Sequence, residues 1–337
     1  ITLVIDETYK NKRDFVRFAV QKPTMKILCL LFALASSGLC RIYHPEENDI
    51  NYKRFQTLIT KQGDIETIDL MQVTVRVVES DVSYYLYTKT NIDAPHSIKN
   101  SNAEELSNSP HFDPSKKTFF IIHGWVDDYT ADVNSLVKAA ILKKIDINII
   151  VVDWSPVASQ SYGTAQGAVN NIGSFVANFI NNMIDTYKLS GSQITLIGHS
   201  LGAHVAGNAG ALIKSKVSHI IGLDPAAPYF TVDNTNNRLD PTDADYVQII
   251  HTNGRFLGFS SSIGHADYYP NGGMIQAGCG IDLLGGCSHA RAFQYLAEAI
   301  EGGKFTAALC GSYTDFQNKK CANNNKALLG TIEVDKR

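Results

Sequence analysis

The sequence has little that would point to a membrane or to nucleic acid. Its most apolar stretch, Ile27 to Ala35, is far shorter than the roughly 20 residues that a membrane-spanning helix needs. The net charge is −3 over 337 residues, and no basic cluster is present that could follow a phosphate backbone. The sequence also lacks internal repeats, Pro-rich linkers and Asn-x-Ser/Thr sequons. We therefore expect neither a transmembrane anchor nor a nucleic-acid partner.

The beginning of the chain predicts export. Lys26 precedes the apolar stretch, and small residues such as Ala35 and Cys40 follow it, which is the arrangement of a secretory signal peptide. We assign residues 25–40 as that signal peptide and predict a secreted, extracellular protein. Residues 1–24 precede the signal, so we expect them to be a non-native upstream extension. A genuine cytosolic extension is the alternative.

The cysteines that remain after the signal peptide predict disulfide bonds. Residues 41–337 suit one large domain better than two, and their even number of cysteines in an exported chain indicates disulfides. Three pairings are possible, and the short separations favour Cys279 with Cys287 and Cys310 with Cys321. Zinc is the weaker alternative, because neither pair has the close spacing of a metal knuckle.

The hydrophobic pattern predicts an α/β fold with a mostly parallel central sheet and helices on both faces. Two strands come first, Val73–Val78 and Tyr84–Thr88; a polar turn separates them, and we expect them to be antiparallel. Short, continuous apolar runs then indicate strands buried on both faces. These runs are Lys117–Ile122, Ile147–Val152, Ile194–Ile197 and Val217–Leu223, and amphipathic helical stretches at Asp132–Ile141 and Val169–Tyr187 alternate with them. Ligands of such sheets bind beyond the carboxyl ends of the strands.

A pentapeptide at one of these strand ends indicates a serine nucleophile. Gly198-His199-Ser200-Leu201-Gly202 follows the apolar run Ile194–Ile197, and a helical pattern begins at Leu201. A serine at such a sharp strand-to-helix turn is the nucleophile elbow of α/β-hydrolases. Its hydroxyl would need a histidine as base and a carboxylate to orient that histidine.

The order of a hydrolase triad narrows the choice of acid and base. Asp224 follows the buried strand Val217–Leu223 and is the best acid, whereas Asp153 precedes the elbow and so breaks the order serine, acid, histidine. Downstream of Asp224 the possible bases are His251, His265 and His289. We favour His289, and this choice depends on the family resemblance described next.

The chain resembles the animal pancreatic-lipase family, which includes secreted triacylglycerol lipases and phospholipases A1. The resemblance runs from about Thr118 to Cys321. It is carried by the segments Ile122–Trp125, Val152–Trp154, Gly198–Gly207, Gly222–Ala226, Ile250–Gly254, Gly264–Asp267, Tyr269–Gly273 and Cys287–Arg291. It implies an α/β-hydrolase fold with Ser200 as nucleophile, Asp224 as acid and His289 as base.

Two backbone N–H groups are expected to bind the oxyanion of the transition state. One belongs to Leu201, the residue after the nucleophile. The second should come from a loop after an early strand, and Trp125 in His123-Gly124-Trp125 has that position. A simple turn with a core-facing indole is the alternative for this tripeptide.

The segment between Cys279 and Cys287 bears on the substrate. Only Gly280–Gly286 separates these cysteines, whereas triacylglycerol lipases of the family carry a much longer lid there. An open rim would admit a polar head group, so the short lid resembles the phospholipase branch. The predicted apolar rim consists of Phe256, Leu257, Phe259, Ile281, Leu283 and Leu284, with ordinary packing as an equally weighted alternative.

No cofactor is expected. Arg238, Asp240 and Asp243 match a calcium site of the family, but Thr235 stands where that site has a glutamate, so we predict no metal. The family's C-terminal β-sandwich is missing from this sequence, so we expect no helper protein to dock there, and the partner is a lipid substrate at an interface.

The sequence thus predicts a secreted serine lipase that hydrolyses acyl esters of glycerolipids through an acyl-enzyme. Phospholipase A1 (sn-1) activity is placed ahead of triacylglycerol lipase activity. The opposing class is a non-catalytic lipid-binding or yolk-type storage protein on the same fold.

Overall fold

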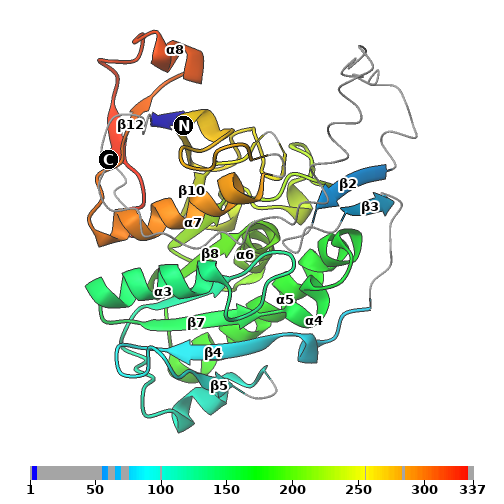
Figure 1. Ribbon diagram of the computed structural model, residues 1–337. Helices are drawn as coiled ribbons and strands as arrows, with labels where there is room; N and C mark the ends of the chain where they lie inside the picture. The colour runs from blue at the N-terminus through cyan, green and yellow to red at the C-terminus, as the bar shows by residue number, and fades with distance from the viewer. Residues whose placement is uncertain are drawn as a thin grey trace.

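The structure, a computed structural model, is organised around one large sheet (Figure 1). It describes residues 2–5, 55–59, 65–69, 76–98, 101–254, 256–282 and 285–332. The strands are β1 (Thr2–Ile5), β4 (Ser83–Tyr87), β5 (His96–Ile98), β6 (Thr118–Ile122), β7 (Asn148–Asp153), β8 (Ile194–His199), β9 (His219–Leu223), β10 (Tyr246–Ile250), β11 (Ala266–Pro270), β12 (Thr306–Leu309) and β13 (Lys326–Leu328). Their order in the sheet is β13-β12-β1-β11-β10-β9-β8-β6-β7-β4-β5.

The middle of this sheet is parallel, as the sequence predicts. Neighbouring strands from β7 through β6, β8, β9, β10 and β11 to β1 all pair in parallel. Every residue of β6, β7 and β8 is buried. Strands covered on both faces need apolar side chains on both faces, which explains the continuous apolar runs.

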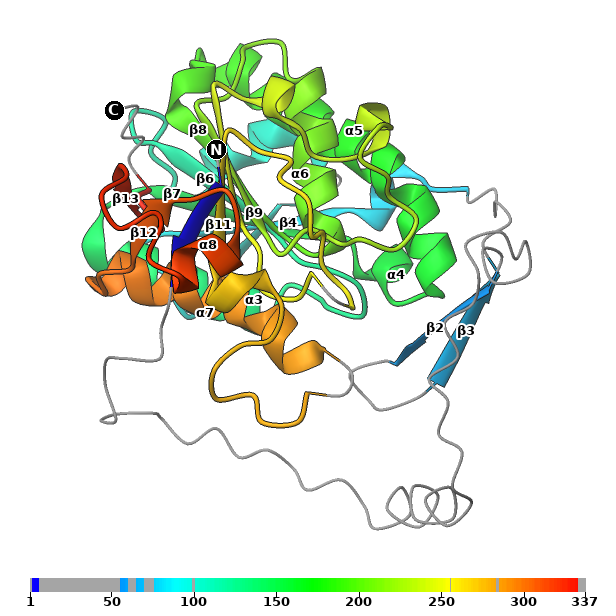
Figure 2. The same ribbon diagram turned by 90° about the horizontal axis from the view of Figure 1, so that it is seen from above.

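Helices cover both faces of the sheet (Figure 2). The long helix α5 (Tyr162–Tyr187) and α6 (Leu201–Leu212) pack on one face, and α3 (Asp132–Lys144) and α7 (Gly286–Glu301) pack on the other. The predicted fold class is therefore confirmed. Two short helices, α4 (Ser155–Ala158) and α8 (Tyr313–Gln317), precede α5 and follow β12. Among the described residues, no helix combines the length and apolar character needed to cross a bilayer.

The beginning of the chain supplies a strand where none was expected. Thr2–Ile5 lies between β11 and β12, parallel to the first and antiparallel to the second. Leu3, Val4 and Ile5 are buried, because apolar side chains inside a covered sheet leave water. Part of residues 1–24, which we predicted to be an upstream extension, thus belongs to the sheet. The signal peptide at 25–40 lies outside the described residues, so its removal stays a prediction.

The predicted pairing of Val73–Val78 with the next strand is wrong for the residues that the structure describes. Arg76–Val78 is not a strand, and β4 pairs antiparallel with β5 and β7 instead. Glu79–Asp81 forms a 3-10 turn in which the Asp81 carboxylate accepts a hydrogen bond from the Val78 N–H. That local turn does not fold the chain back as a hairpin. A separate antiparallel pair, β2 (Phe55–Ile59) with β3 (Ile65–Asp69), was not predicted.

Both favoured disulfides are formed. Cys279 is bonded to Cys287, directly before the second turn of α7, and Cys310 is bonded to Cys321 across α8. Each bridge closes a short ring, and such a ring restricts the unfolded chain more than the folded one.

Candidate active site

Ser200 occupies a strained turn between β8 and α6. Its backbone has φ 56° and ψ −124°, and a positive φ is uncommon for a residue with a side chain. Strain of this kind persists where the surrounding structure enforces it. A Cβ added at Gly198 would lie 2.2 Å from the Gly202 carbonyl oxygen, so the turn has no room for a side chain there. The predicted elbow is present.

Asp224 lies at the end of β9 with its carboxylate fully buried. Its Oδ1 accepts hydrogen bonds from the N–H groups of Thr252 and Asn253, at 2.7 and 3.0 Å. Its Oδ2 lies 2.5 Å from Nδ1 of His289. Because an ionised carboxylate can only accept, Nδ1 carries the hydrogen, and Nε2 of His289 is left as the basic nitrogen.

His289 lies in the first turns of α7, far along the chain from the other two residues. Its N–H donates to the Gly285 carbonyl at 2.8 Å, within the helix start. Nε2 of His199, the residue before the serine, contacts the His289 carbonyl at 3.2 Å, and the two rings lie 4.5 Å apart. This contact joins the elbow directly to the helix that carries His289.

The structure thus brings the three predicted residues to the same edge of the sheet. The Ser200 N–H donates to the carbonyl of Leu223, which directly precedes Asp224. Within the described residues, no hydrogen bond joins the Ser200 hydroxyl to His289. Hydrogen bonds of this kind are often long before substrate binds. The other histidines weighed as bases lie elsewhere: His251 is bonded to Asp267, and Nδ1 of His265 accepts from the Val247 N–H.

The loop after β6 lies against the serine. A Cβ added to Gly124 would be 2.8 Å from Cβ of Ser200. Nδ1 of His123 lies 2.9 Å from the Gly124 carbonyl oxygen, which can only accept, so Nδ1 donates to it. Nε2 of the same ring lies 3.1 Å from the Trp154 backbone nitrogen and 3.3 Å from Oδ1 of Asp153. The N–H of a trans peptide points opposite to its carbonyl, so His123 sets the direction of the Trp125 N–H.

The side chains of the two residues predicted to bind the oxyanion are engaged elsewhere, so this role, which stays a prediction, would fall to their backbone N–H groups. The Trp125 indole is half-buried, stacks edge-on against Tyr162 and donates to the Gln160 carbonyl at 2.8 Å. The Leu201 side chain is buried, and Leu201 is the first residue of α6. The N-terminal N–H groups of a helix have no partner within it and favour negative charge nearby.

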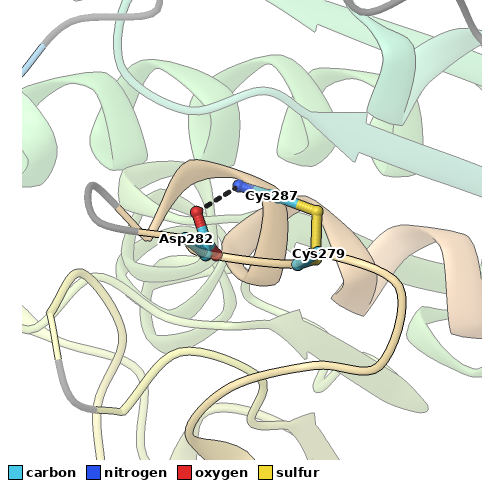
Figure 3. A group of neighbouring side chains, drawn as sticks. All are labelled: Cys279, Asp282 and Cys287. Atoms are coloured by element: carbon cyan, nitrogen blue, oxygen red, sulfur yellow. Dashed lines mark hydrogen bonds between the residues drawn. A yellow bond between two sulfur atoms is a disulfide. The ribbon is translucent and has the colours of Figure 1, made fainter. Parts of the chain in front are cut away.

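The residues Cys279, Asp282 and Cys287 lie together at the beginning of α7, to which Cys287 belongs (Figure 3). The two sulfurs are joined in a disulfide, so neither is available as a thiolate for a metal ion. The Asp282 carboxylate instead accepts from the N–H groups of Cys287 at 3.3 Å and Ser288 at 2.7 Å. It is a cap for the helix that carries His289, and the sequence analysis did not identify it.

The residues that match the family's calcium site are bound to one another and to the backbone. Asp240 accepts from the Thr242 N–H and hydroxyl, and Asp243 accepts from the Asp240 N–H. The Arg238 guanidinium donates to backbone carbonyls. Burial raises the pKa of Asp243 to about 7. Thr235 is exposed in a 3-10 turn. This set of donors does not fit a calcium site well, and no chemistry is assigned to a metal.

The predicted apolar rim is only partly exposed. Ile281 and Phe256 are 87% and 39% exposed, and Leu257 is half-buried. Phe259 is not a rim residue: it is 5% exposed, because its ring packs into the core beside His204. Leu283 and Leu284 lie outside the described residues. Sequence reasoning missed Met274 and Ile275, which are 41% and 45% exposed just before the disulfide ring. Two adjacent apolar residues between Gly273 and Cys279 were the available signal.

The fold and the strained serine at its strand-to-helix turn define the α/β-hydrolase class. The Lipase family model matches residues 53–335, and the chain belongs to this family. The predicted resemblance is therefore confirmed.

Lipoprotein lipases are among the relatives. The one from Neovison vison is 36% identical over 296 residues, which cover 81% of this chain and 62% of that protein. The one from Mus musculus is 38% identical over 248 residues, or 66% and 52% of the two chains. The aligned region thus spans less than two thirds of these relatives. Among solved structures, the serine hydrolase XC6422 from Xanthomonas campestris has a TM-score of 0.36 at 13% identity, covering 57% of this chain and 83% of that one.

Proposed function

We propose that this chain is a serine hydrolase that cleaves acyl esters of glycerolipids, with Ser200 as nucleophile, His289 as base and Asp224 as the orienting acid. The observation that carries the proposal is the 2.5 Å contact between His289 Nδ1 and Asp224 Oδ2 beside the strained Ser200. A buried carboxylate that holds the imidazole hydrogen on Nδ1 makes Nε2 available to accept the serine proton. Membership of the Lipase family supports the same chemistry.

The reaction proceeds in two acyl transfers. Ser200 Oγ attacks the ester carbonyl while Nε2 of His289 takes its proton, and the oxyanion accepts hydrogen bonds from the N–H groups of Leu201 and Trp125. The imidazolium then gives the proton to the leaving glycerol oxygen, which forms the acyl-enzyme. Water, deprotonated by the same nitrogen, attacks this ester and releases the fatty acid and the serine hydroxyl.

Within this class we infer an sn-1 phospholipase in preference to a triacylglycerol lipase. The disulfide ring next to the site spans a sequence separation of only 8, so it leaves little chain to cover the entrance. An uncovered entrance accommodates a charged head group more readily than a lid that closes over the substrate. The exposed Ile281, Met274 and Ile275 give this side an apolar edge for an acyl chain or a lipid surface. The names of the relatives favour the alternative, since they are called lipoprotein lipases.

We also propose that the protein acts outside the cell. The signal-like residues 25–40 and the two disulfides support this, because such bonds persist in oxidising compartments.

The test measures labelling and product release together. The full chain is treated with a fluorophosphonate and, separately, with phosphatidylcholine of defined acyl positions and with triolein, and Ser200→Ala is the control. We expect labelling of the unchanged chain only and release of the sn-1 fatty acid. Triolein cleavage without phospholipid cleavage would reverse the substrate order. A chain that binds lipid but neither reacts nor releases fatty acid would be the storage or carrier protein.

A further inference from the structure

A second histidine–aspartate pair lies one strand away from Asp224. His251 follows β10 and Asp267 belongs to β11, and Nε2 of His251 lies 2.8 Å from Oδ1 of Asp267. Both side chains have no exposed surface. Neither residue can reach a substrate, and the proposed chemistry does not use them.

Both ring nitrogens of His251 face acceptor oxygens. Nδ1 lies 2.7 Å from the Phe259 carbonyl oxygen, which can only accept. Nε2 faces Asp267, whose Oδ1 also accepts from the Ile263 N–H at 2.9 Å. The ring in addition stacks on Tyr269, with the ring centres 4.3 Å apart. His251 is thus held from both ends of its ring and from one face.

A neighbouring buried histidine shows the opposite arrangement. Nδ1 of His204 accepts from the Leu239 N–H, and Nε2 donates to the Ala226 carbonyl. One donor and one acceptor suit a neutral ring, and burial lowers the pKa of His204 to about 3. His251, between two acceptors, is the histidine that needs a carboxylate partner.

The loop that His251 closes is the loop that holds Asp224. Directly after His251, the N–H groups of Thr252 and Asn253 both donate to Asp224 Oδ1. The chain then turns back, and Phe259 meets the His251 ring through its carbonyl. The His251 ring thus joins the two ends of the segment 251–259.

Two backbone hydrogen bonds join this segment to the residues that follow Asp224. The Phe259 N–H donates to the Pro225 carbonyl at 2.8 Å, and the Ala227 N–H donates to the Leu257 carbonyl at 2.8 Å. A Cβ added to Gly258 would lie 2.3 Å from Asp224 Oδ1. A small displacement of the segment would therefore displace the carboxylate.

We propose that His251 and Asp267 are positioning residues, forming a buried hydrogen-bonded clamp that holds the segment 251–259 and so keeps Asp224 directed at His289. The expected effect of the clamp on the reaction rate rests on the proposed function. Its effect on the Asp224–His289 hydrogen bond can be measured without any turnover. Loss of the clamp should lower kcat on the order of 100-fold, the effect of a displacement of about 1 Å in a catalytic group. KM should change little, because no substrate contact is lost.

The test compares four variants of the full chain. His251→Phe keeps a ring against Tyr269 and removes both hydrogen bonds. Asp267→Ala removes the carboxylate, whereas Asp267→Asn keeps an acceptor oxygen at the Oδ1 position, which faces His251 Nε2 and accepts from the Ile263 N–H. The matched control is His219→Phe: His219 is also buried in the sheet, but neither of its ring nitrogens has a hydrogen-bond partner among the described residues. Each variant is assayed below its unfolding temperature, as judged by circular dichroism.

The second readout is the low-field proton resonance of the His289 Nδ1–H, assigned by its absence in His289→Gln. We expect His251→Phe and Asp267→Ala to lose kcat and to shift or broaden this resonance. Asp267→Asn and His219→Phe should retain both. If His251→Phe does not fold, the clamp is tested by comparing kcat and the resonance of Asp267→Ala with those of Asp267→Asn.

Two results would overturn the clamp. One is a folded His251→Phe or Asp267→Ala with unchanged kcat and an unchanged resonance. The other is an Asp267→Asn variant that loses as much kcat as Asp267→Ala, because the hydrogen-bonded geometry would then not be what matters. An unmodified chain that neither reacts with fluorophosphonate nor hydrolyses lipid would contradict the proposed function instead, and the resonance would still test the clamp.

Discussion

Two of the three histidine–aspartate pairs among the described residues use the same groups for different purposes. His289 contacts Asp224 through Nδ1 and has an 11% exposed side chain, and in the proposed mechanism its second nitrogen takes the serine proton. His251 contacts Asp267 through Nε2, has no exposed surface, and its second nitrogen is occupied by a backbone carbonyl. A pair with one unoccupied nitrogen can exchange protons, whereas a pair enclosed on both sides can only hold structure. The environment of the ring, rather than the residue types, separates the two roles.

The largest effect should come from changing the acid of the open pair. Asp224→Asn would present an amide donor to His289 and favour the wrong tautomer, so we expect kcat to fall on the order of 10⁴-fold with the fold intact. Steady-state hydrolysis and fluorophosphonate labelling rates measure this. The same change at Asp267 should cost little, and equal losses at the two aspartates would remove the distinction between the pairs.

The next largest effect should come from a substitution that changes neither pair and fills the space beside Ser200. Gly124→Val would place side-chain carbon within about 3 Å of Ser200, given the 2.8 Å approach of an added Cβ, and should displace the Trp125 N–H. We expect kcat to fall about 100-fold, the value of one oxyanion donor. Gly311→Ala is the control, since an added Cβ there meets only Asp315 Oδ2, at 3.7 Å. Normal activity in Gly124→Val would contradict the assigned oxyanion loop.

A smaller effect is expected from the cap of α7, the helix that carries His289. His251 lies on no helix, so the cap supports only one of the two pairs. Asp282→Ala removes the acceptor of the Cys287 and Ser288 N–H groups and should cost about 1 kcal/mol of unfolding free energy, with a modest loss of kcat. Chemical denaturation gives the first value. Asp282→Asn retains one of the two acceptor oxygens, so its stability should lie between those of the unchanged chain and Asp282→Ala. Identical stability of all three proteins would show that the cap contributes nothing.

A further effect, on the pH dependence of stability and not on the rate, concerns a buried carboxyl without a histidine partner. Burial raises the pKa of Asp243 to about 7, above the value of about 3.9 for an unfolded aspartate. The folded chain therefore holds a proton that the unfolded chain releases, and this contribution to stability is present below pH ~4 and lost as the pH rises towards 7. Asp243→Asn should flatten this part of the stability profile, measured by denaturation from pH 4 to 8. If the slope of unfolding free energy against pH were unchanged in Asp243→Asn, the pH dependence would belong to other groups.

Local patterns were sufficient for much of the site. Ser200 was predicted from its glycines and the strand before it, and Asp224 from its place after a buried run, because both signals lie within a few residues of the side chain concerned. His289 needed the family resemblance, since nothing in its neighbourhood separated it from His251 or His265. Phe259 was wrongly predicted to lie on the rim, because the sequence does not distinguish an apolar residue that faces solvent from one that faces the core.

The sequence by itself determined the alternation of buried strands and helices, the elbow and the short disulfide rings, since these follow from periodicity and spacing along the chain. Only the tertiary structure decided which aspartate meets which histidine, that Asp282 caps α7, and that Thr2–Ile5 lies inside the sheet. These contacts join residues that are separated along the chain and brought together by the sheet. Whether a side chain forms a hydrogen bond or is buried depends on the residues that lie against it in the folded chain. Those neighbours are defined only when the strands have paired.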